Sequence, residues 1–123
     1  MGDKHNCHPG GSFLFAVSDY VSFFKNLRPT GQIVVAAIGG PPSPVVVALD
    51  GSNPSLKSSC APTLGGSGTG VPGLRLKAVT DGLGGRGIYN QGMIGGQVGE
   101  VNICSADYSP ALQLIGDRIA QWY

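Results

Sequence analysis

The segment from Ile33 to Ile38 limits the fold of this chain more than any other feature. All six of its residues are apolar, and four of them are β-branched. An apolar run of this length is typical of a strand that is covered on both faces, as in the parallel sheet of an α/β protein. Gly39-Gly40-Pro41-Pro42 follows and ends the strand. The sequence therefore predicts an α/β domain built around a buried strand.

Two helices are predicted on either side of this strand. From Val17 to Leu27 the apolar residues recur three and four positions apart, as on one face of a helix: Val17, Tyr20, Val21, Phe24 and Leu27. Ser18 is placed to cap this helix, and Arg28 is expected to end it because a proline follows. A shorter helix is predicted from Pro72 to Asp81, since proline suits the first helical position and Gly82 suits the end.

A third helix is predicted to close the chain at Tyr123, after a short strand from Val101 to Cys104. Asp107 or Ser109 is its expected cap, with Pro110 in its first turn. Its face toward the sheet is predicted by helical spacing to be Leu112, Ile115, Ile119 and Trp122.

Long loops are expected between these elements, because the 123 residues include 21 glycines and 9 prolines. Residues 1–12 are predicted to be a disordered lead-in, and residues 13–123 a single partial domain. Val45–Leu49, which follows a proline, is predicted to be a short edge strand. Residues 50–71 are predicted to be an irregular insert, and residues 83–99 a flexible loop or an edge hairpin.

The low and scattered charge of the chain argues against a nucleic-acid partner. Charged residues make up 12% of the sequence, the net charge is +1, and the eight lysines and arginines are scattered singly. A nucleic-acid-binding domain would show a basic stripe, so no nucleic acid is expected.

No apolar run approaches the ~20 residues that a membrane span requires. Residues 1–8 contain no apolar signal core, so the location of the chain stays open.

The first eight residues contain a compact set of metal-ligand types: Asp3, His5, Cys7 and His8. Zn²⁺ accepts cysteine and histidine, but a structural zinc site needs four ligands in a closed arrangement. No second cluster in the sequence completes such a site, so adventitious metal binding is favoured over a dedicated site. A small metal-dependent hydrolase that uses this cluster is the alternative function.

No complete catalytic constellation is visible, and the expectation is that the chain is not an enzyme. Both histidines lie in the first eight residues, where no nucleophile is placed beside them. The glycine-rich segments 65–70 and 84–87 lack the strand, helix and Gly-Lys-Ser/Thr context of a phosphate loop. Gly39-Gly40 is followed by prolines where a nucleotide-binding helix would begin.

The sequence contains three cysteines, Cys7, Cys60 and Cys104, whose redox state is open between two alternatives. In a reducing compartment all three would remain thiols. In an oxidising compartment two of them could pair, and the third would need a partner elsewhere.

Several segments, by their order and spacing, resemble the late part of bacterial von Willebrand factor A-type domains, and are most similar to a branch in secreted or surface proteins of myxobacteria-like organisms. The segments are 17–27, 32–42, 56–60, 73–78 and 103–112. The resemblance extends from about residue 3 onward and implies a partial doubly wound, mostly parallel sheet with two or three strands, about three helices and long Gly/Pro/Ser-rich loops. It also implies a non-enzymatic, adhesion-type domain that binds a protein or another extracellular ligand.

Domains of this family hold Mg²⁺ or a similar cation on an Asp-x-Ser-x-Ser loop, with a threonine and an aspartate from later loops. That first loop is absent here, and the nearest match is Asp50-Gly-Ser52-Asn-Pro54, in which proline replaces the second serine. An ordinary turn is expected at these residues. Asp3 lies near the place of the family's late ligand. We therefore expect no cofactor, and a divalent cation (Mg²⁺ or Ca²⁺) only together with an upstream half.

The resemblance further implies a disulfide between Cys60 and Cys104 that ties the insert to the sheet, with Cys7 left over. It places the parent family outside the cytoplasm, in the periplasm, at the cell surface or secreted. The leading interpretation is a truncated or degenerate binding domain without the adhesion site. Unpaired strand edges in so small a sheet favour self-association. A fragment without an independent function is the third interpretation.

Overall fold

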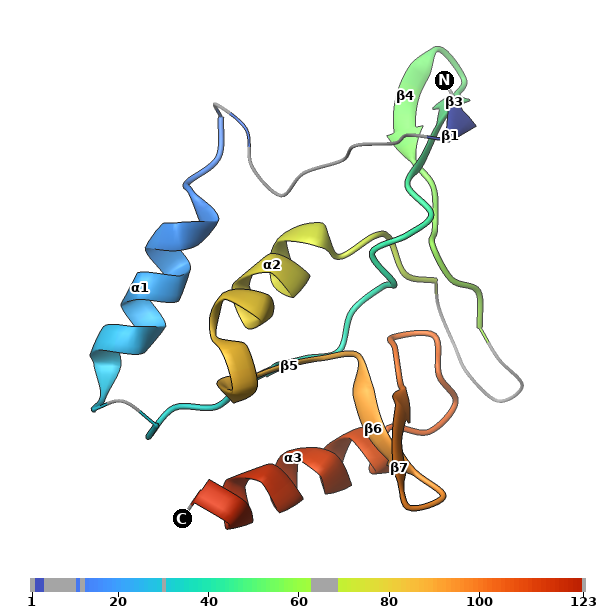
Figure 1. Ribbon diagram of the computed structural model, residues 1–123. Coiled ribbons are helices and arrows are strands. Elements are labelled where there is room, and N and C mark those ends of the chain that lie inside the picture. The colour runs from blue at the N-terminus through green and yellow to red at the C-terminus, as the bar shows by residue number, and fades with distance from the viewer. Residues whose placement is uncertain (1, 4–10, 12, 30, 63–68, 123) are drawn as a thin grey trace.

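The computed structural model describes residues 2–3, 11, 13–29, 31–62 and 69–122 of the chain. Within them, three α-helices and several small sheets form a mixed α/β arrangement, which confirms the predicted class at this coarse level (Figure 1). One strand pair is parallel, β2 (Val35–Ala37) with β5 (Gly87–Tyr89). The other strand pairs of the described residues are antiparallel. The expectation of a mostly parallel sheet with two or three strands is therefore wrong for this part of the chain.

The parallel pair and α2 (Leu74–Gly82) form a strand–helix–strand unit, in which α2 packs against both β2 and β5. The helix begins after the predicted Pro72, because Pro72 forms a parallel bridge with Gly40 instead. β2 is shorter than the predicted strand 33–38, and Ala36 at its centre is exposed. The expected cover on both faces of this strand is thus not present in the described residues.

Helix α1 (Val17–Leu27) has the predicted bounds and packs on α2. It ends where the backbone of Arg28 turns extended, as expected for a residue before proline. The predicted cap is wrong: Ser18 lies inside the helix, and the N-cap is Ala16, which makes no side-chain hydrogen bond. None of the residues of α1 is fully buried, so this helix covers the domain only loosely.

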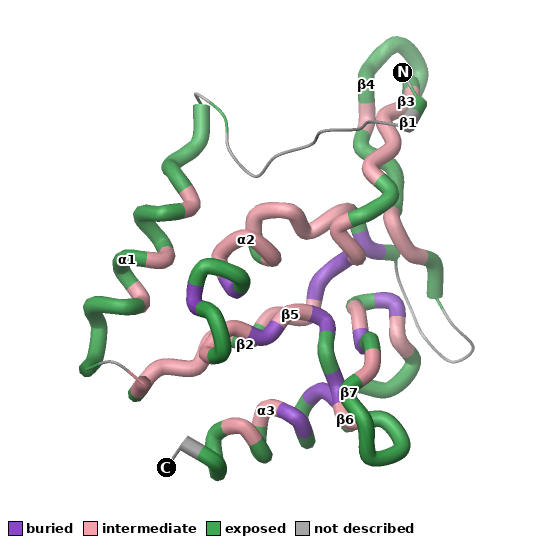
Figure 2. The backbone as a smooth tube through the Cα atoms, in the orientation of Figure 1, coloured by how far each residue is buried: buried purple, intermediate pink, exposed green. Residues whose placement is uncertain are grey.

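Buried residues lie at the end of α2, after β2, in β5, and where α3 (Ser109–Trp122) packs on β6 (Gln91–Ile94), as Figure 2 shows. The apolar residues of this core are Leu83, Ile88, Val101, Cys104, Ala111 and Leu114. The predicted face of α3 is wrong in part, because Leu112 is 64% exposed and Ile119 is 42% exposed. Ala111 and Leu114 face inward instead, with Ile115 half-buried.

Gly92 explains this rotation of α3. A Cβ on Gly92 would lie 2.9 Å from the Ala111 nitrogen and 2.5 Å from a methyl carbon of Val101. The missing side chain lets the first turn of α3 approach the backbone of β6 directly. The small Ala111, rather than Leu112, therefore occupies the contact.

The turn before α3 replaces the strand predicted from Val101 to Cys104. The Asn102 side-chain oxygen accepts a hydrogen bond from the Cys104 N–H (2.9 Å), and the Asn102 N–H donates to the Ser105 hydroxyl oxygen (3.0 Å). Such local side-chain bonds compete with strand pairing. Of the two predicted caps, Ser109 is the first residue of α3. Asp107 accepts a hydrogen bond from the Ser109 N–H (2.9 Å) and thus satisfies a backbone donor at the start of the helix.

A three-stranded antiparallel sheet lies at the far end of the molecule from α3 (Figure 1). Its order is β1 (Gly2–Asp3), β3 (Val46–Asp50) and β4 (Asn53–Leu56). β3 is therefore central rather than the predicted edge strand, and the predicted irregular insert 50–71 contains β4. The Gly51-Ser52 turn joins β3 to β4, and Gly51 has a φ of +63°, which glycine adopts without strain.

A second hairpin, β6 with β7 (Gln97–Glu100), confirms the hairpin alternative for residues 83–99. Gly95 and Gly96 form its two-residue turn with φ values of +58° and +81°. The same segment also contains β5 and the 3₁₀ helix η1 (Gly84–Arg86), neither of which was predicted. Among the described residues, no helix has the length and apolar character needed to cross a membrane.

Candidate functional site

The carboxyl ends of β2 and β5 meet at one edge of the parallel pair, where Gly39 follows β2 and Asn90 follows β5. The Asn90 N–H donates to the Ala37 carbonyl oxygen (3.1 Å), and the Asn90 side-chain oxygen accepts a buried hydrogen bond from the Gly39 N–H (2.8 Å). Asn90 has a φ of +51°, which asparagine tolerates better than most residues. Asn90 thus fixes the relative position of the two strand ends. In α/β proteins, ligands bind in the crevice outside such ends.

We expect Asn90→Ala to lower the free energy of unfolding by about 2–3 kcal/mol, because it leaves the buried Gly39 N–H without its acceptor and strains a left-handed backbone. Urea denaturation monitored by circular dichroism measures this change. Asn90→Gly is the matched variant, since glycine accepts the same φ. It should recover part of the loss, and equal midpoints for wild type and Asn90→Ala would refute the role of Asn90.

Gly40 is clamped just beyond the strand end. Its carbonyl oxygen accepts hydrogen bonds from the Tyr89 hydroxyl (2.5 Å) and from the Gly73 N–H (3.3 Å). A Cβ on Gly40 would lie 2.0 Å from the Val71 carbonyl oxygen, so glycine is required for this approach. Burial raises the pKa of the Tyr89 phenol, and the Asn90 side chain beside it acts in the opposite direction without outweighing the burial. Tyr89 therefore stays protonated and donates to Gly40 at neutral pH.

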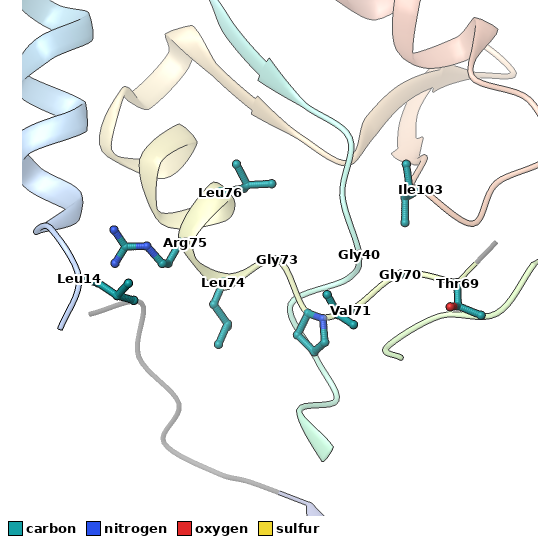
Figure 3. Close-up of a pocket in the computed structure, with 11 residues that line it drawn as sticks. Leu14, Gly40, Thr69, Gly70, Val71, Gly73, Leu74, Arg75, Leu76 and Ile103 are labelled. Atoms are coloured by element: carbon teal, nitrogen blue, oxygen red, sulfur yellow. The ribbon is translucent and has the colours of Figure 1, made fainter. Parts of the chain in front are cut away.

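A groove of about 630 Å³ opens beside Gly40, under the first turn of α2 (Figure 3). We call it the α2 groove. The residues that line it are Leu14, Gly40, Thr69, Gly70, Val71, Pro72, Gly73, Leu74, Arg75, Leu76 and Ile103. Its lining is mainly apolar, and Arg75 is the one ionisable side chain among these described residues. The groove is thus suited to an apolar ligand rather than to acid–base chemistry.

Arg75 fixes the end of the α2 groove that lies toward α1. Its guanidinium donates a hydrogen bond to the Phe15 carbonyl oxygen (2.7 Å) and lies 5.9 Å from the centre of the Tyr20 ring. Figure 3 shows Leu14 and Arg75 on this side and Ile103 and Thr69 on the other. Arg75 therefore joins α2 to the segment before α1 and to α1 itself.

The other end of the groove is fixed by a disulfide between Cys60 and Cys104, whose Cα atoms are 6.1 Å apart. The pairing implied by the family resemblance is therefore present. The Ile103 N–H donates to the Gly39 carbonyl oxygen (3.0 Å), and a Cβ on Gly70 would lie 2.4 Å from a methyl carbon of Ile103. The bridge thus holds the insert and the turn before α3 against the strand end of β2.

The metal-ligand types predicted near the N-terminus are not brought to this groove as far as the structure describes them. Asp3 lies in β1, opposite Val46 of β3, while His5, Cys7 and His8 lie outside the described residues. The described residues contain no group of three or more histidine, cysteine, aspartate or glutamate side chains that could hold a metal ion. Asp50 and Ser52 are exposed at the β3–β4 turn, which confirms the ordinary turn expected there.

Local sequence patterns found one boundary of the site, and the family resemblance implied the disulfide at the other end, but the remaining contacts of the site were missed. The end of β2 at Gly39-Gly40 was visible as a glycine pair after an apolar run. The hydrogen bond between the Gly39 N–H and the Asn90 side chain had no local sequence signal, because the two residues are 51 positions apart. The approach of Val71 to Gly40 depends in the same way on long-range packing. Comparison of the chain with protein-family models, with curated proteins and with solved structures finds no match.

Proposed function

We propose that this chain is a non-enzymatic binding domain whose ligand occupies the α2 groove. The apolar lining of the groove at the carboxyl edge of the parallel strands carries this proposal. Its volume of about 630 Å³ falls within the roughly 300–1,000 Å³ that is usual for ligand sites. Apolar side chains of a protein or of another extracellular ligand fit this lining.

The proposed parent architecture is an A-type, partly doubly wound domain in truncated or degenerate form. The β2–α2–β5 unit supports it, because a parallel pair joined by a helix is the repeating unit of doubly wound folds. The disulfide supports it too, since the resemblance implied the same pairing. In this proposal a divalent cation, Mg²⁺ or Ca²⁺, binds only together with ligands from an upstream segment. A location outside the cytoplasm agrees with the Cys60–Cys104 disulfide, because disulfides persist in oxidising compartments.

The α2 groove is tested with a neutral apolar probe, N-phenyl-1-naphthylamine, whose fluorescence rises on burial. We expect saturable binding to the wild-type chain. Leu76→Glu places a charge in the groove at a side chain that is already 52% exposed. Because the bound probe would cover this charge and leave it unpaired, Leu76→Glu should weaken probe binding at least about tenfold.

Leu49→Glu is the matched control, since Leu49 is 56% exposed on β3 and lies outside the groove. It should leave probe binding unchanged. Equal weakening by both variants would contradict the groove as the binding site. A wild-type chain that binds the probe but melts without cooperativity would instead support the interpretation as a fragment without independent function.

A further inference from the structure

The outer edge of β2 has no partner strand in the described part of the chain. The sheet that contains β2 has two strands, and β5 is the other one. Ala37 bonds to β5, because its carbonyl oxygen accepts a hydrogen bond from the Asn90 N–H that follows β5 (3.1 Å). The backbone groups of successive strand residues point to opposite sides, so the N–H and C=O groups of Ala36 and Ile38 point away from β5. Within the described residues, no hydrogen bond reaches these four groups.

This edge is accessible and carries neither a charge nor a proline. Its central residue, Ala36, is exposed, and residues 33–38 are all apolar. Beyond the strand the same edge is covered, since the Gly40 carbonyl oxygen accepts the Gly73 N–H (3.3 Å) and Gly40 forms a parallel bridge with Pro72. The open part of the edge is therefore the apolar run itself.

The other described strand edges have features that hinder pairing with a further strand. The Lys57 N–H donates to the Val46 carbonyl oxygen (2.8 Å), so by alternation the backbone of Pro54 faces the outer side of β4. Proline has no N–H to offer to another strand. β1 and β7 contain the acidic residues Asp3 and Glu100, and charges on an edge oppose pairing. The residues of β5 are buried or half-buried.

The apolar side chains of β2 and its flanks favour a partner at this edge. Water satisfies the outward backbone groups of an exposed strand, so hydrogen bonding alone does not require one. In residues 33–38, however, every side chain except that of Ala36 is half-buried, and the rest of each surface stays in contact with water. A further strand on this edge covers part of these side chains and pairs the backbone at the same time.

Opposite charges lie near the two ends of β2, which favours a second copy of this chain as the partner. Lys25 and Arg28, both exposed, line a cavity with Ile33 at the amino end of the strand. Glu100 lines another cavity with Pro41, just beyond the carboxyl end. Within the described residues none of these three charges takes part in an ion pair. When two identical edges pair antiparallel, the amino end of each strand lies beside the carboxyl end of the other, so these charges attract across the contact.

We propose that the outer edge of β2 pairs with the same edge of a second copy of this chain, antiparallel about a two-fold axis at Ala36. The two Ala36 residues then exchange a pair of backbone hydrogen bonds, and Val34 of each copy pairs with Ile38 of the other. The result is a four-stranded sheet in the order β5–β2–β2–β5. Its outer edges are those of β5, whose residues are buried or half-buried, so the assembly closes at two chains. So short an edge makes a reversible dimer. This contact does not depend on the ligand of the α2 groove.

Sedimentation equilibrium of the full oxidised chain tests the proposal in a Cys7→Ser background, in which this residue cannot link two copies covalently. We expect the average mass to rise from that of one chain toward that of two as the protein concentration is raised. Hydrogen–deuterium exchange followed by NMR locates the contact. The amide N–H groups of Ala36 and Ile38 should exchange more slowly in the concentrated sample, because they are paired in the dimer.

Charged variants at the centre of the contact test the two-fold register. Ala36→Lys and Ala36→Glu should each weaken association about fivefold, because the axis places like charges directly opposite each other. An equimolar mixture of the two variants should associate more tightly than either alone, since a lysine then faces a glutamate. Ala36 is exposed, so thermal melts should show unchanged folding. Leu49→Lys is the matched control, because Leu49 is 56% exposed on β3, outside this edge, and the change should leave association unaltered.

Four results would overturn the proposal. The first is a chain with Cys7→Ser alone that keeps the mass of one chain at every concentration. The second is equal weakening by Ala36→Lys and Leu49→Lys, which would place the contact on another surface. The third is a mixture of Ala36→Lys and Ala36→Glu that associates no better than either variant, which would show that Ala36 does not face itself. The fourth is growth beyond two chains, which would indicate open-ended edge pairing instead of a closed dimer.

Discussion

The free energy of unfolding of a Gly87→Ala variant is expected to fall by about 3 kcal/mol or more. A Cβ on Gly87 would lie 1.8 Å from the Thr80 carbonyl oxygen and 2.5 Å from the Thr80 carbonyl carbon. These atoms belong to the backbone, so no side-chain rotation relieves the contact. Gly87 has ordinary extended dihedral angles, and the loss thus measures packing alone. α2 would have to move away from β5, which opens the strand–helix–strand unit.

Gly85→Ala is the matched control for this prediction. Gly85 lies in η1, two positions before Gly87, and a Cβ there would meet no atom within 4 Å. Its stability should stay within about 1 kcal/mol of the wild type, with a gain if the unfolded chain loses freedom. Urea denaturation at 25 °C compares the two variants. Similar midpoints for Gly85→Ala and Gly87→Ala would show that α2 does not pack on β5 as described.

Removal of the disulfide is the second change with a large expected effect. For a sequence separation of 44 residues, loop entropy predicts that the double variant Cys60→Ser/Cys104→Ser loses about 4 kcal/mol. Domains of this kind are stable by roughly 5–15 kcal/mol in total, so the variant should unfold at a much lower urea concentration. The buried core of the chain is small, which leaves little to compensate for the loss.

Two measurements distinguish the loss of the disulfide from other effects of the cysteine-to-serine substitutions on stability. Wild-type protein treated with a thiol reductant should unfold at the same urea concentration as the double variant. Cys7→Ser removes a cysteine without touching the bridge and should keep the wild-type midpoint in oxidising buffer. If the double variant and the oxidised wild type unfolded together, the bridge would contribute nothing to stability.

Sequence reasoning succeeded where the signal was local. The bounds of α1 follow from its helical spacing and from Pro29, both of which act within a few residues. The β6–β7 hairpin likewise follows from the Gly95-Gly96 pair, although an open loop stayed an alternative. The pairing of Cys60 with Cys104 came from the family resemblance, since spacing alone allows other pairs.

The failures arose where distant parts of the chain decide the structure. β5 has only three residues and begins at Gly87, so it shows no strand pattern of its own. The inner face of α3 is set by the missing side chain of Gly92, which helical spacing in α3 cannot reveal. The α2 groove depends on the contact of Gly40 with Val71, 31 positions apart, and therefore had no sequence signal.

The disulfide also has a topological consequence. The bridge closes a covalent ring that contains α2, β5, β6 and β7, while β2 and α1 remain outside it. The α2 groove crosses this boundary, with Leu74 and Leu76 inside the ring and Gly40 and Leu14 outside. A ligand that pushes α2 away from Gly40 therefore works only against hydrogen bonds and packing, never against a covalent bond. The width of the groove is therefore adjustable, while the separation of Cys60 and Cys104 is fixed by the covalent bridge.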